Sequence, residues 1–138
     1  MTAQEYLKRP ETIRQEIRRR RTRIETLRRL ATRFSGQLSD VRVRTSPDPA
    51  RMQAFLAEAA DEERAVAELE EKRKQALADT ALLISRLPEE KMIRILEMRY
   101  LDLLEWEEII GRIGSATTVY RLHRLALDIL APPPEPGD

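Results

Sequence analysis

Apolar residues recur along the first part of the chain in alternating steps of four and three, the period of a coiled-coil helix. This first series runs through Ile13, Ile17, Arg20, Ile24, Leu27, Ala31, Phe34 and Leu38, and Arg20 is the one polar residue that interrupts it. A second series begins at Met52 and keeps step as far as Leu87. Residues 39–50, between the two, are rich in proline and small polar side chains, which is typical of a loop. The pattern predicts helices over about residues 4–38 and 51–87.

Two long helices joined by a short loop fold back most simply as an antiparallel hairpin, because each apolar stripe needs a partner. A fold near residue 44 would set Phe34 opposite Phe55 and Ile24 opposite Val66. The same stripes could also pair between two chains. The pattern therefore predicts a long coiled-coil hairpin over residues 1–87 or an assembly of several copies, of which a dimer is the simplest.

Residues 88–130 carry three shorter amphipathic segments. Pro88 is expected in the first turn of the first segment, where a missing N–H costs nothing. The second segment, "LEWEEIIGRI", places Trp106 and Ile109 on one face, and Gly114 is suited to end it in a left-handed conformation. Ser115 is placed to cap the third segment. We therefore expect a small domain of three helices, followed at residues 131–138 by a proline-rich, disordered tail.

The third of these helices has one apolar and one polar side. Its apolar stripe would consist of Val119, Leu122, Ala126, Leu127 and Leu130. A helix, a tight turn and a helix with basic residues early in its sequence form the layout of a helix-turn-helix, whose second helix enters the major groove by its N-terminal part. Arginine can bind guanine or clamp a phosphate, and threonine offers a methyl and a hydroxyl group. The residues predicted to contact double-stranded DNA are Ala116, Thr117, Thr118, Tyr120, Arg121 and Arg124.

Composition supports an all-α protein with long exposed helices. Charged residues make up 36% of the 138 residues and aromatic residues only 4%, a balance unlike that of a thick globular core. The chain has no cysteine, which excludes disulfides and thiolate chemistry. Its start is polar, and no apolar run is long enough to cross a bilayer. The sequence therefore predicts a cytoplasmic protein, associated with the nucleoid if it binds DNA.

The net charge of +1 conceals a strong asymmetry along the chain. Thirteen Lys and Arg stand against five Asp and Glu in residues 1–44, whereas residues 92–138 hold five basic against eight acidic residues. The run "IRRRRTR" could be a nucleic-acid patch. In the hairpin register, however, residues 18–31 lie opposite the acidic residues 58–71. We expect most of these arginines to pair with acids across the hairpin, which leaves phosphate contacts open for the others.

The segment "LPEEKMIRILEMRYLDLLEWEEIIGRIGSATTVYRLHRLALDIL" resembles region 4 of the bacterial sigma-70 family. The matching positions are Leu87, Pro88, Leu96, Arg99, Tyr100, Trp106, Glu107, Glu108, Ile109, Gly114, Ser115, Val119, Ala126, Leu127 and Leu130. With the preceding helical pair, the chain looks more like small phage and prophage proteins that carry a sigma-like helix-turn-helix behind a coiled hairpin. This resemblance implies a transcriptional regulator that binds double-stranded DNA, with RNA polymerase as a further candidate partner.

Other chemistry finds little support in the sequence. His123 lies beside the apolar stripe of the third helix, where we expect it to pack or to cap, because neither a cysteine nor a second histidine is present to complete a metal site. Adjacent acids such as Glu62 and Glu63 point in different directions on a helix, unlike paired catalytic carboxylates. No glycine-rich phosphate loop is found. We predict no enzymatic activity, no cofactor and no metal.

Two rivals to a sequence-specific transcriptional regulator remain open. Small terminase subunits for DNA packaging also join a helix-turn-helix to a coiled-coil oligomerisation element, and a ring-sized mass in solution would favour that function. A sigma-like adaptor could instead bind RNA polymerase without touching DNA. It would show no DNA binding at low salt.

Overall fold

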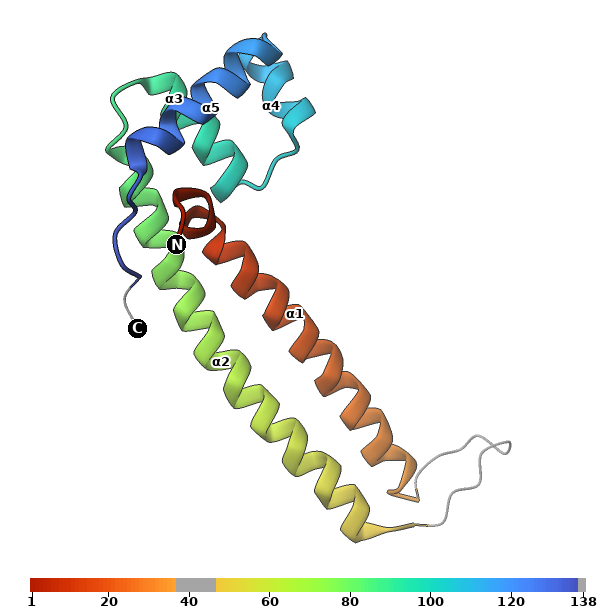
Figure 1. The fold of residues 1–138 in the computed structure, drawn as a ribbon. Coiled ribbons are helices and arrows are strands. Elements are labelled where there is room, and N and C mark those ends of the chain that lie inside the picture. Colours follow the sequence, from red (N-terminus) through yellow and green to blue (C-terminus); the bar gives the residue numbers. More distant parts are fainter. Residues whose placement is uncertain (37–46, 137–138) are drawn as a thin grey trace. The chain divides into compact units, whose positions relative to one another are not determined.

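The structure is a computed structural model that describes residues 1–36 and 47–136. Its elements are α1 (Ala3–Arg33), α2 (Pro49–Ser85), α3 (Glu90–Leu96), the π-helix η1 (Glu97–Leu101), α4 (Trp106–Ile113) and α5 (Ala116–Leu130) (Figure 1). No strand occurs in those residues, and the predicted all-α class is confirmed. No helix in the described ranges is both long and apolar enough to cross a membrane.

The contacts divide the chain into two compact units. The hairpin unit comprises residues Ile13–Lys72, and the terminal unit comprises Met1–Thr12 together with Arg73–Asp138. The division thus falls inside α1 and α2, whereas the sequence placed a boundary at residue 88. The reason is that Ala3, Tyr6 and Leu7, at the start of α1, are buried in the same core as the carboxy-terminal helices.

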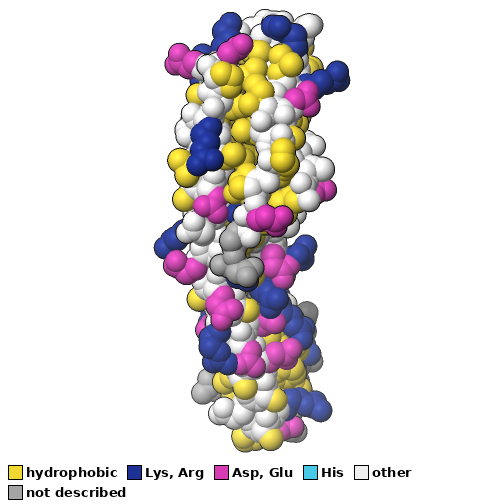
Figure 2. Space-filling view, turned by 60° about the vertical axis from the view of Figure 1, so that its left-hand side comes forward, with side chains coloured by type: hydrophobic (Ala, Val, Ile, Leu, Met, Phe, Trp, Pro, Cys, Tyr) yellow, Lys and Arg dark blue, Asp and Glu magenta, His cyan; other side chains and the backbone are white. Residues whose placement is uncertain are grey.

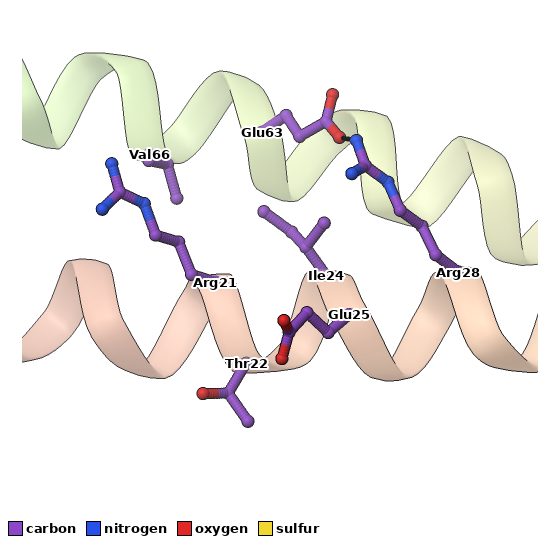
Figure 3. A pocket seen from close by; sticks show the side chains of 7 residues that line it. All are labelled: Arg21, Thr22, Ile24, Glu25, Arg28, Glu63 and Val66. Atoms are coloured by element: carbon purple, nitrogen blue, oxygen red, sulfur yellow. Dashed lines mark ion pairs between the residues drawn. The ribbon is translucent and has the colours of Figure 1, made fainter.

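The hairpin unit is an antiparallel pair formed by α1 and α2. Phe34 and Phe55 stack with ring centroids 5.9 Å apart, and Ile24 and Val66 belong to one buried cluster with Ile17. Both contacts confirm the predicted register. Figure 3 shows Ile24 and Val66 pointing toward one another between the helices, where they line an open groove of about 420 Å³.

Ion pairs join the two helices of the hairpin unit, as the opposed charge blocks predicted. Arg20 binds Glu62 and Arg23 binds Glu58, each at 3.1 Å. Two further pairs of the same kind are Arg21 with Glu70 and Arg28 with Glu63. Because these groups remain partly or largely exposed to solvent, each pair adds little to the stability of the fold. Their main effect is to destabilise alternative registers of the two helices, in which like charges would lie opposite each other.

α1 is shorter than predicted, because its last turn ends at Arg33 and not at residue 38. Gly36 adopts a left-handed conformation with φ 79°, and the Phe34 carbonyl accepts a bond from the N–H of Asp48 instead of a helical N–H. Residues 37 and 38, and residues 39–46 of the predicted loop, lie outside the described residues.

α2 begins earlier than the predicted residue 51. Pro49 takes the first helical position, where its missing N–H costs nothing, and the Asp48 carboxylate accepts from the N–H of Arg51 at 3.1 Å. The helix ends at Ser85, before the predicted residue 87, because the N–H groups of Arg86 and Leu87 turn back to carbonyls three residues earlier.

In the terminal unit, the first carboxy-terminal helix starts later than predicted. Pro88 precedes α3, whose N-cap is Glu89, so the expectation of Pro88 in the first helical turn is wrong. The first bond of the α-helical type runs from Ile93 N–H to the Glu89 carbonyl. Residues 131–136, the described part of the predicted tail, contain neither helix nor strand, while residues 137 and 138 lie outside the described residues. That the tail is disordered stays a prediction.

The wider turn of η1 was not predicted from the sequence. α3 passes directly into this π-helix, and the N–H of Asp102 reaches back to the Glu97 carbonyl at 2.9 Å. Both Met98 and Tyr100 are buried as a result. Leu103 then takes a left-handed conformation with φ 58°, which ends the element before α4. Single π-turns of this kind often occur at functional positions.

The terminal unit has the thicker core of the two. Its fully buried side chains include Leu7, Ile84, Ile95, Leu96, Ile109 and Val119, which come from α1, α2, α3, α4 and α5. A capping box starts α1, since Thr2 and Glu5 each accept the other's backbone N–H at 3.1 Å. This core provides a rigid base for α4 and α5.

Candidate nucleic-acid interface

α4 and α5 are separated by a two-residue turn that the sequence signals predicted correctly. Gly114 is left-handed with φ 105°, and its N–H donates to the Ile110 carbonyl at 2.7 Å. The Ser115 hydroxyl then accepts from the N–H of Thr118 at 3.3 Å and caps α5. The turn is therefore fixed by a glycine conformation and a side-chain cap.

α5 is two-sided, as expected. Val119, Leu122, Ala126 and Leu130 are buried. Among the predicted contact residues, Ala116, Thr117, Tyr120, Arg121 and Arg124 are exposed, but Thr118 is half-buried. Its position beside the cap explains the difference. The structure therefore brings five of the six predicted residues to the surface of one helix and places Thr118 at the margin of that surface.

A cluster of aromatic side chains joins α4 to α5, and the sequence pattern did not predict it. The Trp106 ring, at the start of α4, lies 5.5 Å from the Tyr120 ring and 4.8 Å from the His123 ring, centroid to centroid. The Arg99 guanidinium lies over the Trp106 ring, 4.6 Å from its centroid, and donates to the Leu104 carbonyl at 3.1 Å. Trp106 thereby ties η1, α4 and α5 together.

His123 has the packing role that the sequence predicted. Its Nε2 lies 2.7 Å from the Tyr100 hydroxyl, and the two rings stack. Burial lowers the pKa of His123, and the positive charges of Arg99 and Lys8 lower it further. Burial likewise raises the pKa of Tyr100. Both groups are therefore held neutral near pH 7, which suits a structural contact at the edge of the core.

The exposed side of α5 carries two cations without partners. Neither Arg121 nor Arg124 forms an ion pair with any described residue, although Asp128 lies one turn after Arg124. On α4, by contrast, Arg112 is bound to Glu108 at 3.0 Å. Two unpaired guanidinium groups on the exposed side of a helix can reach base edges or phosphates of a duplex.

Apolar side chains also reach the surface of the terminal unit. Figure 2 shows them gathered over one face of this unit, whereas charged side chains of both signs cover the hairpin unit in the same view. On α5 itself, Leu125 is 42% exposed and Ile129 is 50% exposed. The exposed surface of α5 is therefore polar over its first half and partly apolar toward its carboxy-terminal end.

Comparison of the chain with protein-family models, with curated protein sequences and with solved structures finds no match.

Proposed function

We propose that the chain is a sequence-specific DNA-binding transcriptional regulator of phage or prophage type, in which α4 and α5 form a helix-turn-helix. The observation that carries the proposal is the left-handed Gly114 and capping Ser115 in front of a helix with unpaired Arg121 and Arg124. In this arrangement α5 enters the major groove by its first turns. The core behind it holds the helix in place, which precise contacts to bases require.

Each exposed polar residue of α5 would make a different kind of contact with DNA. Arg121 and Arg124 would donate paired hydrogen bonds to guanine or clamp phosphates, and Thr117 would contact a thymine methyl or a phosphate. Tyr120 is 50% exposed while its ring rests on Trp106, so its hydroxyl would be presented with little loss of side-chain freedom. Free N–H groups at the start of α5 would add a phosphate contact.

Selection from a library of randomised duplexes tests this proposal. The full chain is expected to enrich a short common motif, because a helix in the major groove reads a few successive base pairs. A double-length, two-fold symmetric motif would indicate that two copies bind together. Enrichment of no motif, at salt concentrations where duplexes are retained, would contradict sequence-specific recognition.

A second candidate function is a sigma-like adaptor that binds RNA polymerase without contacting DNA. The exposed Leu125 and Ile129 favour it, because contiguous apolar surface fits a protein partner better than a phosphate backbone. Co-purification with polymerase that is lost on replacing both residues by serine, together with no duplex binding at low salt, would support this function.

Oligomeric state separates regulation from DNA packaging. A regulator of this kind would be a monomer or, as we propose, a homodimer, whereas a packaging subunit would form a large ring. The mass of the full chain in solution, measured by light scattering, distinguishes these outcomes.

A further inference from the structure

The arginines of α1 fall into two groups with different surroundings. Arg20, Arg21, Arg23 and Arg28 are bound to glutamates of α2. Arg18, Arg29 and Arg33 are exposed and form no ion pair or side-chain hydrogen bond with any residue that the structure describes. We propose that Arg18, Arg29 and Arg33 form a phosphate-binding face that holds the DNA backbone; the inference rests on the proposed function and adds a second contact to it.

Helical spacing places these three arginines together. Arg18, Thr22 and Arg29 follow one another at i, i+4 and i+11, so they share one side of α1, and Arg33 lies one turn further along. Figure 3 shows Thr22 on the side of α1 that points away from α2, whereas Arg28 points toward Glu63. The face is therefore the outer side of the helix, which is free of the acids of α2.

The size of the face suits an extended polyanion. Arg18 and Arg29 are separated by about three helical turns, roughly 16 Å along the axis. Several phosphates of one strand lie within that length, whereas a single small anion could contact only one of the two guanidinium groups. The face is thus suited to a nucleic-acid backbone.

The net acidic charge of residues 92–138 explains why DNA binding needs a second phosphate-binding face. Phosphate neutralisation supplies most of the affinity of proteins for duplex DNA. Residues 92–138, which contain α4 and α5, hold more acidic than basic residues. Arg121 and Arg124 alone would give a weak complex. Arg18, Arg29 and Arg33 are cations that the ion pairs between α1 and α2 leave free among the described residues.

Salt dependence of DNA binding measures the contribution of this face. The full chain and its R18Q/R29Q/R33Q variant are titrated with a labelled duplex of mixed sequence at several KCl concentrations. Each lost phosphate contact reduces the slope of log K against log [KCl] by about 0.9, so the triple variant should lose about 2 to 3 from the slope. An E25Q variant should bind more tightly than the natural chain, because a repulsive carboxylate one helical turn from Arg29 is removed.

A matched control separates the face from net charge. The R21Q/R23Q/R28Q variant removes the same charge from arginines that are bound to α2, and its slope should change by much less than that of the triple variant. Circular dichroism verifies that both variants remain helical. An unchanged slope in R18Q/R29Q/R33Q, or equal losses in both variants, would overturn the proposed face.

The same titrations distinguish this inference from the proposed function. If preference for the selected motif over the mixed duplex persists while the slope is unchanged, the α1 face is wrong and the role of α5 stands. If no duplex is bound even at low salt, both are wrong. Tighter binding to duplex RNA of the same length than to DNA would overturn DNA as the occupant of the face.

Discussion

The Tyr100 hydroxyl and the Nε2 of His123 lie 2.7 Å apart and join the π-helix η1 to α5. The contact occurs where η1 displaces the regular helical path and buries Tyr100. Trp106 closes the other side of the imidazole in an edge-on arrangement. His123 of α5 therefore contacts both Tyr100 of η1 and Trp106 of α4.

Acid should weaken the terminal unit through His123. Its pKa is lowered from the ordinary value of 6.5, so the unfolded chain takes up the proton first. The contribution of neutral His123 to the free energy of unfolding is complete above pH 6.5. It is lost as the pH falls through the lowered pKa of His123 in the folded state. Urea unfolding followed by the fluorescence of Trp106, the single tryptophan, should show this loss.

The H123Q variant provides the control for this pH dependence. Glutamine cannot titrate, so the variant should be less stable than the natural chain at pH 7 and should lack the decline below pH 6.5. The pKa of Glu16 in the hairpin unit is also lowered, chiefly by its hydrogen bond to Arg19, but that group titrates below its ordinary value of 4.5, outside this window. An identical decline in H123Q would show that another group is responsible.

Alanine substitutions at Gly111, inside α4, and at Gly114, just after its end, should change the free energy of unfolding in opposite directions. Gly114 has φ 105°, so G114A should lower the free energy of unfolding by about 1–2 kcal/mol through backbone strain. Gly111 lies inside α4 with open space around it, so G111A should raise the free energy of unfolding by about 0.5–1 kcal/mol. Chemical denaturation measures both, and a stabilising G114A would show that the turn is built differently.

Removal of the cap on α5 should cost stability without changing the core. S115A should lower the free energy of unfolding by about 0.5–2 kcal/mol, because the N–H of Thr118 loses its acceptor. S115D should retain most of the stability, since aspartate caps equally well. Equal stabilities of S115A and the natural chain would mean that the hydroxyl contributes nothing.

A buried hydroxyl in α2 offers a stabilising substitution. Thr80 is 0% exposed, and its Oγ1 has no hydrogen-bond partner among the described residues. T80V keeps the shape and removes the unsatisfied group, so it should raise the free energy of unfolding by about 1–3 kcal/mol. T80S keeps the hydroxyl, loses the methyl group and should destabilise. Destabilisation by T80V would indicate that the hydroxyl is hydrogen-bonded in the protein.

The sequence predicted the elements that depend on local chemistry and periodicity. Heptad spacing set Phe34 against Phe55, and the pair Gly114 and Ser115 marked the turn before α5. Helix ends were less accurate, because bonds such as that from Asp48 N–H to the Phe34 carbonyl connect distant parts of the chain. Periodicity carries no information on such bonds.

The aromatic support of α5 could not be predicted for a similar reason. The contacts of Trp106 with Tyr120 and His123 depend on how α4 and α5 pack and on the extra width of η1. No residue in "EMRYL" distinguishes a π-turn from a continued α-helix. The exposure of the predicted contact residues of α5, in contrast, followed from its apolar stripe alone, apart from Thr118.

Affinity of the R121A/R124A variant for the selected duplex tests the central claim, that α5 reads DNA. We expect the affinity for the selected duplex to fall by about ten- to a hundredfold or more, since a good arginine contact to a base provides about 1–3 kcal/mol of discrimination. The affinity for a duplex of mixed sequence should fall much less. Equal affinity of the variant and the natural chain for the selected duplex would contradict it.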